Sequence, residues 1–251
     1  MTDALLQVTG LNKRFGGVIA SDNLDLDVAA GEIHAVIGPN GAGKTTLIAQ
    51  LSGAIRPDSG TILFDGEDIG RLPNHARAAR GLARSFQITS IFHEFTALEN
   101  VMLAVQAHDG HSFRFWRPAH TEQSLRGPAG AALERVGLGD RGKVIARHLS
   151  HGEHRQLEIA MALATNPKML LLDEPMAGLG ADESRRMVEL LQTLKGAQTI
   201  LLVEHDMDAV FALAGRITVL VYGRTIATGS PDDIRANPEV RTAYLGEDEA
   251  A

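Results

Sequence analysis

The segment Gly38-Pro39-Asn40-Gly41-Ala42-Gly43-Lys44-Thr45-Thr46 decides how this chain folds. The apolar run Ile33 to Ile37 precedes it and predicts a buried strand, and apolar residues recur at helical spacing from Leu47 to Ile55 after it. A strand, a glycine-rich loop and a helix form the context in which G-x-x-x-x-G-K-[ST] is a phosphate-binding P-loop. The alternative is an ordinary glycine turn before a helix.

The residue types of this loop suit a nucleoside triphosphate bound with Mg²⁺. Glycines let the backbone curl so that successive N–H groups point inward, and the following helix turns its unpaired N-terminal donors to the same anion. Lys44 is expected to reach the β- and γ-phosphates, and the Thr45 hydroxyl is expected to ligate Mg²⁺. The loop predicts nucleoside triphosphate binding and leaves the class of protein open.

The composition narrows the classes of function. The chain has 251 residues, 44% of them hydrophobic, and a formal net charge of −7, which argues against a nucleic-acid-binding surface. The absence of cysteine excludes disulfides, thiol catalysis and Cys-type zinc sites, and it fits a reducing cytoplasm. We expect no signal peptide, and the apolar runs are far shorter than the ~20 residues that span a bilayer. Any membrane role is therefore expected to be peripheral.

An acidic pair follows a second buried strand. Met169 to Leu172 is an unbroken apolar run, typical of a strand covered on both faces of a parallel sheet, and it ends in Asp173 and Glu174. Ligands bind at the carboxyl ends of such strands, where the P-loop also sits. We expect Asp173 to contact Mg²⁺, mostly through water, and Glu174 to polarise the attacking water as general base. The alternative is a structural pair of surface acids.

Two further segments carry candidate site residues. Ser150 and Glu153 form a capping box before a long helix, and Gly152 permits close approach of an anion to the same helix N-terminus. Capping and anion binding are compatible, so both readings stay open. His205 follows the buried strand Thr199 to Val203 at the sheet edge of the acidic pair. It would hydrogen-bond a γ-phosphate or the attacking water there, although a lone histidine at a strand end is usually structural.

The remaining segments predict an antiparallel sheet and an irregular insert. Alternation within residues 5–30 and the run Thr61 to Phe64 favour antiparallel strands beside the nucleotide site. Phe15 would either stack on an adenine base or be a core or turn aromatic. Residues 108–130 are rich in His, Arg, Gly and Pro and contain an aromatic and basic cluster. They predict an irregular insert that is either a partner contact or a locally packed surface loop.

The order of these pieces resembles the nucleotide-binding subunit of ABC transporters over nearly the whole chain. A P-loop alone occurs in many families, but a P-loop followed by a signature just before Walker B is specific to this one. The motifs are a stacking aromatic at Phe15, Walker A at Gly38 to Thr46, the Q-loop at Gln87, the signature Leu149-Ser150-His151-Gly152-Glu153, Walker B at Met169 to Asp173 with Glu174, and the switch histidine His205.

The resemblance implies an ATPase with ATP and Mg²⁺ as cofactors. Its fold class is α/β: a P-loop NTPase core with a mainly parallel sheet, an N-terminal antiparallel β subdomain and an inserted helical subdomain at about 88–165 of a single domain, 1–251. The implied site residues are Phe15, Gly38, Pro39, Asn40, Gly41, Ala42, Gly43, Lys44, Thr45, Thr46, Ser150, His151, Gly152 and Glu153 for ATP, Thr45, Gln87 and Asp173 for Mg²⁺, and Lys44, Gln87, Glu174 and His205 for catalysis.

The resemblance also implies partners. Two ATPase subunits, identical or related, would meet head to tail, with each ATP held between one P-loop and the signature of the other subunit. They would drive transmembrane permease subunits from the cytoplasmic face of the inner membrane, with a periplasmic substrate-binding protein as an indirect partner and no nucleic acid. Gln87 and the segment Ile88 to Asn100 are where we expect the coupling surface.

Within the family, the chain looks like the ATPase subunit of branched-chain amino acid uptake systems. The resemblance lies in Arg14 to Gly17, Glu204 to Met207 and the ending Asn237 to Gly246. The ATPase of lipopolysaccharide export is similar in its C-terminal stretch and is the first alternative. Soluble ABC ATPases that act on ribosomes or DNA usually carry two cassettes or a long coiled coil. A P-loop kinase or other NTPase has no use for the segment Leu149 to Glu153.

Two features depart from the pattern of the wider family. His151 and Glu153 stand where glycine and glutamine are preferred, and Gly180 replaces the aspartate that usually closes the D-loop, the segment Ala177 to Gly180. Gly180 puts the usual contact across the dimer in doubt. Neither change removes a group that binds phosphate on the P-loop side or performs the hydrolysis.

Overall fold

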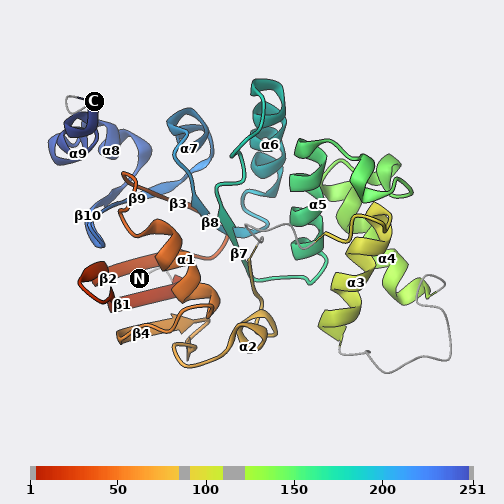
Figure 1. Cartoon of the computed structure of the whole chain (residues 1–251), viewed down its shortest axis with the longest axis horizontal. Helices are drawn as coiled ribbons and strands as arrows, with labels where there is room; N and C mark the ends of the chain where they lie inside the picture. The colour runs from red at the N-terminus through yellow and green to blue at the C-terminus, as the bar shows by residue number, and fades with distance from the viewer. Residues whose placement is uncertain (1–3, 85–90, 110–121, 249–251) are drawn as a thin grey trace.

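The computed structural model describes residues 4–84, 91–109 and 122–248 (Figure 1). Within these ranges six strands form a central sheet in the order β10-β9-β3-β8-β7-β6. The neighbours from β9 to β6 are parallel, and β10 pairs antiparallel with β9, so the predicted mainly parallel core is confirmed. The strands are β3 (Ile33–Ile37), β6 (Leu82–Arg84), β7 (Met169–Asp173), β8 (Thr199–Val203), β9 (Arg216–Val221) and β10 (Arg224–Gly229).

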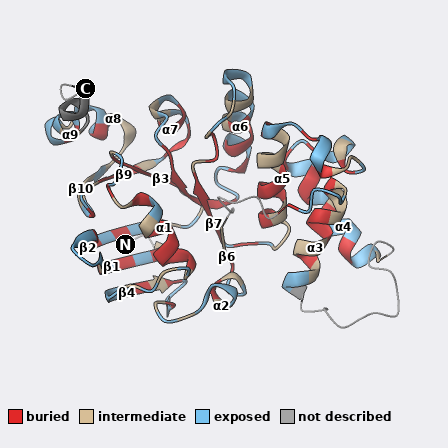
Figure 2. Ribbon diagram, in the orientation of Figure 1, coloured by how far each residue is buried: buried red, intermediate tan, exposed pale blue. Residues whose placement is uncertain are grey.

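The adjacent strands β3, β8 and β7 form the buried middle of this sheet. Every residue of all three is buried, as the red strands in Figure 2 show. Burial on both faces explains why the sequence of each is an unbroken apolar run rather than an alternating one. Because the three strands are parallel, their carboxyl ends meet at one edge of the sheet, and the loops that follow them share that edge.

A second sheet is antiparallel and has the order β2-β1-β4-β5 within the described residues, which confirms the predicted N-terminal sheet. Helix α1 (Lys44–Ser52) packs between the two sheets, because its Leu47 and Leu51 share one core with Leu24 of β2 and Leu171 of β7. The strands of this sheet are β1 (Ala4–Phe15), β2 (Val18–Ala29), β4 (Ser59–Phe64) and β5 (Glu67–Asp68).

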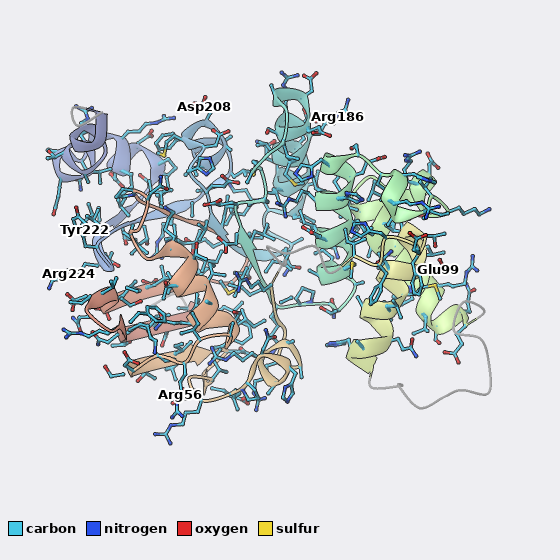
Figure 3. The ribbon with its side chains drawn as sticks, in the orientation of Figure 1. Arg56, Glu99, Arg186, Asp208, Tyr222 and Arg224 are labelled. Atoms are coloured by element: carbon cyan, nitrogen blue, oxygen red, sulfur yellow. The ribbon has the colours of Figure 1, made fainter. Side chains whose placement is uncertain are left out.

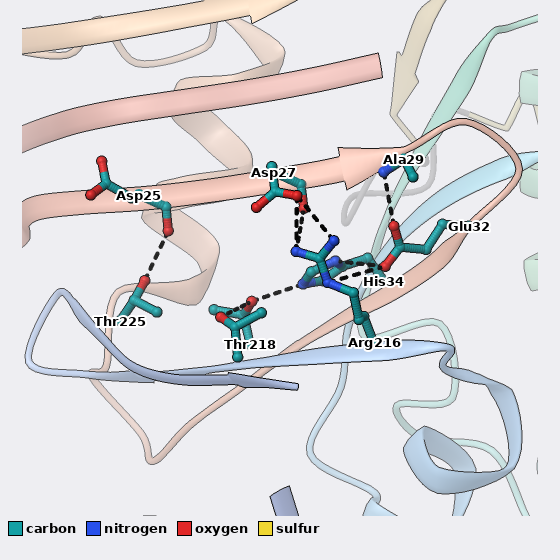
Figure 4. Close-up of polar contacts among 9 residues, drawn as sticks. Asp25, Asp27, Ala29, Glu32, His34, Arg216, Thr218 and Thr225 are labelled. Atoms are coloured by element: carbon teal, nitrogen blue, oxygen red, sulfur yellow. Dashed lines mark hydrogen bonds and ion pairs between the residues drawn. The ribbon is translucent and has the colours of Figure 1, made fainter. Parts of the chain in front are cut away.

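Polar contacts tie the antiparallel sheet to the central one (Figure 4). Arg216 at the start of β9 donates from Nη2 to Asp27 Oδ2 on β2 at 3.0 Å. Buried His34 of β3 contacts Thr218 Oγ1 through Nε2 at 2.8 Å and Glu32 Oε1 through Nδ1 at 3.1 Å. The contact of Arg216 with Asp27 joins the two sheets, whereas the contacts of His34 satisfy a buried polar group of the central sheet.

Helices α3 (Ala97–Asp109), α4 (Gln123–Arg135) and α5 (His151–Leu163) pack together beside the central sheet (Figure 1). The prediction of an irregular insert over 108–130 is wrong for its last part, because α4 begins at Gln123 and continues through Pro128. The buried face of α4 has helical spacing, which the intervening Gly and Pro residues hide in the sequence. The aromatic and basic cluster of the insert lies outside the described residues.

The other helices are short or lie at the periphery. They are α2 (Asn74–Ala78), α6 (Ala181–Leu194), α7 (Met207–Leu213), α8 (Pro231–Ala236) and α9 (Pro238–Asp248), with 3₁₀ turns at Gly139–Arg141 and Ala146–His148. Across the described ranges, no helix combines the length and apolar character needed to cross a bilayer.

Candidate functional site

The glycine loop between β3 and α1 is held closely by two neighbouring strands. At Gly38, with φ of +154°, an added Cβ would lie 2.1 Å from the carbonyl oxygen of Leu220 on β9. At Gly43, with φ of +103°, it would lie 2.3 Å from the carbonyl oxygen of Ala20 on β2. Both positions need a left-handed backbone and have no room for a side chain, so only glycine fits them. Tertiary packing as well as phosphate binding therefore dictates these two residues.

Lys44 lies at the start of α1 with its amine turned back into the loop. Its Nζ donates to the carbonyl oxygen of Gly38 at 2.6 Å and to that of Pro39 at 3.0 Å, and the side chain is buried. Thr45 is exposed and Thr46 is half-buried. The loop thus combines an ammonium group with the N-terminal N–H groups of α1, which is the chemistry of a phosphate site.

Asp173, the last residue of β7, is a buried carboxylate with one free oxygen. Its Oδ2 accepts a hydrogen bond from Arg84 Nη2 at 3.1 Å, and its Oδ1 is buried with no hydrogen-bond partner within the described residues. Burial raises the pKa of Asp173, and the charges of Arg84 and Lys44 work against that shift. A buried carboxylate oxygen without a partner is costly. An oxygen-preferring cation such as Mg²⁺ fits this oxygen.

Glu174 leaves the sheet through a strained backbone. Its φ is +51°, and its N–H donates to the carbonyl oxygen of Val203 on β8 at 2.9 Å. A left-handed conformation costs a non-glycine residue about 1–2 kcal/mol, so the surrounding contacts must enforce it. The side chain is half-buried at the sheet edge next to Asp173. It lies directly after the buried Asp173, where the sequence predicts a base beside a carboxylate that would bind Mg²⁺.

His205 follows β8 and is held there by its buried neighbour Glu204. Glu204 is 0% exposed; its Oε1 accepts from the N–H of Met176 at 2.8 Å, and its Oε2 accepts from the N–H of His205 at 3.1 Å. The His205 side chain is 65% exposed, with Nδ1 3.8 Å from Glu204 Oε2. Burial raises the pKa of Glu204, and its backbone hydrogen bonds oppose the shift. Glu204 therefore joins the segment after β7 to the segment after β8.

The predicted capping box at the start of α5 is confirmed, and a second carboxylate lies on the same helix end. The N–H of Glu153 donates to Ser150 Oγ at 3.2 Å, and the N–H of Ser150 donates to Glu153 Oε2 at 2.8 Å. Glu183 of α6 accepts with Oε1 from Ser150 Oγ at 3.2 Å and from the N–H of Gly152 at 3.1 Å. Arg141 Nε donates to Glu153 Oε1 at 2.7 Å.

Phe15 is an exposed aromatic near the glycine loop. Its ring is 48% exposed, and Lys13 Nζ lies 5.5 Å from the ring centroid, so the core alternative is wrong for it. A second exposed ring, Tyr222, marks the β9–β10 turn in Figure 3 and is 82% exposed. Within that turn, the N–H of Gly223 donates to the carbonyl oxygen of Ala42 at 2.9 Å. The turn thus forms a wall of the loop that sequence reasoning did not assign.

The structure brings the sequence-predicted residues into two groups. The P-loop, Asp173, Glu174 and His205 share the edge where β3, β7 and β8 end, whereas Ser150 to Glu153 lie apart on α5, joined to α6. Gln87 lies outside the described residues. Sequence reasoning missed Arg84, Glu204 and Glu183. An acid directly after a buried strand was a signal for Glu204, but nothing local pointed to the other two.

Comparisons with known proteins agree with this geometry. Residues 21–177 match the family described as ABC transporter, and residues 224–250 match the family described as branched-chain amino acid ATP-binding cassette transporter. The high-affinity branched-chain amino acid transport ATP-binding protein BraF of Pseudomonas aeruginosa is 40% identical over 254 residues, which cover 98% of this chain and 100% of BraF. The protein of the same description named LivG, of Escherichia coli, is 41% identical over 257 residues, with 98% and 100% covered.

The lipopolysaccharide export system ATP-binding protein LptB of Haemophilus influenzae is 34% identical over 245 residues, which cover 97% of this chain and 98% of LptB. Among solved structures, an ATP-binding cassette of an ABC transporter in its ADP conformation has a TM-score of 0.86 at 29% identity, covering 98% of this chain and 100% of that one. The family match spans more than half of the sequence, and the relatives align over nearly their full lengths. The chain therefore belongs to the ABC transporter family, as an ATP-binding and ATP-hydrolysing subunit.

Proposed function

We propose that ATP is hydrolysed at the sheet edge where β3, β8 and β7 end. Lys44 would exchange its bonds to the loop carbonyls for the β- and γ-phosphates, and Glu174 would accept a proton from the attacking water. His205 would donate to the γ-phosphate from a position set by Glu204. Thr45, Asp173 and Gln87 would hold Mg²⁺, which neutralises phosphate charge when bound. The buried, unpartnered Asp173 Oδ1 beside the P-loop is the observation that carries this proposal.

The substitution Glu174→Gln tests the assignment of the base. An amide keeps the shape of the side chain but cannot accept the proton, so ATP should still bind while turnover falls by about 10²–10⁴-fold. The exposed Glu189→Gln on α6 is a matched control that should keep the wild-type rate. Phosphate release and nucleotide affinity are measured on all three proteins. Near wild-type turnover in Glu174→Gln would rule out Glu174 as the base.

The proposed working unit is a head-to-tail pair of ATPase subunits. The Ser150 hydroxyl and the Gly152 N–H at the start of α5 would bind the γ-phosphate of an ATP held by the other subunit's P-loop. We propose that α5 moves with an inserted helical subdomain, at about 88–165 of the single domain 1–251. Loss of the γ-phosphate on hydrolysis would remove the contact and reopen the pair. The exposed ring of Phe15 suits stacking on adenine.

A cavity between helices α3 and α5 and strand β6 of the central sheet supports docking of a membrane subunit. It has a volume of about 350 Å³ and is lined by α2, β6, α3 and α5, with Met161 and Ala104 on its apolar side. Glu158 also lines it, with a buried Oε1 that has no partner within the described residues. We propose that a cytoplasmic helix of a permease subunit fills this cavity and supplies a donor to Glu158. Arg84 lines the same cavity and contacts Asp173, which gives docking a direct route to the catalytic edge.

We infer that the transported substrate is a branched-chain amino acid and that the subunit works at the cytoplasmic face of the membrane. The support is the match of residues 224–250 and the printed function of BraF and LivG. Lipopolysaccharide export is the alternative, on the likeness to LptB. The test is affinity purification of the Glu174→Gln form with ATP from solubilised membranes. Two permease chains with a leucine-, isoleucine- or valine-binding partner would support uptake, lipid-export proteins would select the alternative, and ribosomes or DNA alone would overturn transport.

A further inference from the structure

The N-terminus of α5 already holds an anion that comes from this chain. Glu183 lies in the first turn of α6, and its Oε1 accepts from the hydroxyl of Ser150 at 3.2 Å and from the N–H of Gly152 at 3.1 Å. An added Cβ on Gly152 would lie 2.9 Å from that oxygen, so the glycine gives the carboxylate its access. Arg186, labelled on α6 in Figure 3, helps to line the small cavity around this contact. A carboxylate from one helix therefore occupies the positive end of another.

The donors that Glu183 uses cannot serve a second anion at the same time. The Ser150 hydroxyl has a single proton, which it donates to Glu183, while its oxygen accepts from the N–H of Glu153. The N–H of Gly152 also carries a single proton. In the proposed function, on which this inference rests, these two donors bind the γ-phosphate of the ATP held by the second subunit. The Glu183 carboxylate and that γ-phosphate therefore compete for the same donors. A γ-phosphate can bind the signature only after the Glu183 carboxylate has left it.

We propose that Glu183 sets the ATP concentration at which the dimer closes, because it holds the signature donors until a γ-phosphate replaces it. A γ-phosphate offers more negative charge and more acceptor oxygens than a carboxylate, so ATP can displace Glu183. ADP has no γ-phosphate to place there, and the carboxylate stays bound. Glu183 thereby makes the open state the favoured one unless ATP is present.

Contacts around Glu183 involve both segments that depart from the family pattern. Its Oε2 accepts from the N–H of Gly180 at 3.4 Å, and Gly180 has no side chain to cap α6 in its place. The imidazole of His151 lies against Gly178, where an added Cβ would be 3.2 Å from Nε2. Hydrogen bonds from Gly152 and Gly180 lower the pKa of Glu183, so it is an anion at neutral pH. Release of Glu183 would therefore free the D-loop together with the signature.

The test measures nucleotide-dependent dimerisation in the Glu174→Gln background. Glu183→Gln keeps the shape of the side chain and removes its charge, and Glu183→Ala removes the contact. Asp182→Asn is the matched control, because it removes the same charge from the neighbouring, exposed residue of α6. Light scattering against ATP concentration should show half-maximal dimer at about 10-fold lower ATP in both Glu183 variants, a size usual for coupled sites. The control should match its parent, and ADP should yield no measurable dimer in any variant, because it has no γ-phosphate for the freed donors to bind.

Hydrogen exchange gives a second readout that needs no dimer. Without nucleotide, the peptide containing Gly152 should exchange faster in Glu183→Ala than in the parent, while circular dichroism shows the helices retained. If the parent forms a dimer with ATP but both Glu183 variants need as much ATP or more, the inference about Glu183 is overturned and the proposed dimer stands. Glu183 would then hold the donors in place for the γ-phosphate instead of competing with it. If neither the parent nor any variant forms a dimer with ATP, the proposed head-to-tail pairing of subunits is refuted. The competition between Glu183 and the γ-phosphate at the signature is refuted with it.

Discussion

Removing the Glu204 carboxylate should disturb the fold and the catalytic edge together. This side chain is fully buried and accepts hydrogen bonds from the N–H of Met176 at 2.8 Å and from that of His205 at 3.1 Å. In Glu204→Ala both N–H groups lose their acceptor, that of Met176 in a buried place and that of His205 in a partly buried one. In Glu204→Gln one end of the amide still accepts, but its NH₂ group faces the second N–H.

The size of the effect follows from the number of donors left unpaired. A buried donor without a partner costs about 1–3 kcal/mol and a partly buried one costs less, so Glu204→Ala should lose about 1–5 kcal/mol and Glu204→Gln about 1–3 kcal/mol. For a protein of this size, 1 kcal/mol lowers Tm by about 2–4 °C. The alanine variant should therefore melt roughly 2–20 °C lower. Asp208→Ala, on the exposed first turn of α7 (Figure 3), is the control and should change stability by less than about 1 kcal/mol.

The assays are thermal unfolding and steady-state ATP hydrolysis on the same four proteins. Turnover in Glu204→Ala should fall more than the affinity for ATP, because the backbone that positions His205 is released while the contacts of the P-loop are kept. The reasoning is refuted if Glu204→Ala unfolds at the temperature of Asp208→Ala and keeps the wild-type rate. A loss of ATP affinity equal to the loss of turnover would likewise contradict it, because the whole sheet edge would then have shifted.

Three further predictions concern the loop, the metal-binding acid and pH. Gly43→Ala should lose about 2–5 kcal/mol, from a left-handed backbone and a clash with β2, whereas Gly41→Ala, with no described atom within 4 Å of its Cβ, should lose about 1–2 kcal/mol in chemical denaturation. Arg84→Met should lose about 3 kcal/mol, because it strands the buried Asp173; equal stability to wild type would disprove that pairing. Burial alone would raise the pKa of Glu32, but its hydrogen bonds outweigh the effect of burial, so the pKa lies below its ordinary value of 4.5. Its stabilisation is thus present above pH 4.5 and lost as pH falls further, so the deficit of Glu32→Gln should vanish in acid unfolding curves.

The linkage between docking and catalysis rests on residues that no motif contains. Arg84 lines the proposed docking cavity and donates to Asp173, while its Nη1 lies 3.4 Å from Ser52 Oγ at the end of α1. A helix entering the cavity would therefore act on the helix of the P-loop and on the Walker B carboxylate through one side chain. The same physical logic applies at the signature, where Glu183 makes α5 and α6 interdependent.

The sequence by itself determined the fold class and the sheet edge at which the proposed catalytic residues meet. The strand, loop and helix around Gly38 to Thr46 are contiguous, so their local pattern was enough to predict them. The apolar runs of β7 and β8 end in Asp173 and His205, and parallel strands must bring such ends to one edge of the sheet. Each of these predictions uses interactions within one segment or a rule that holds for every parallel sheet.

Tertiary structure alone decided which side chains hold that edge in place. Arg84 meets Asp173 and Glu183 meets Gly152 across 89 and 31 positions of the chain, and neither contact leaves a periodic pattern. The left-handed backbone of Glu174 and the helix through Pro128 are also set by surrounding packing against local preference. The physical reason is that hydrogen bonds and burial act between neighbours in space, whereas propensity and periodicity report neighbours in sequence.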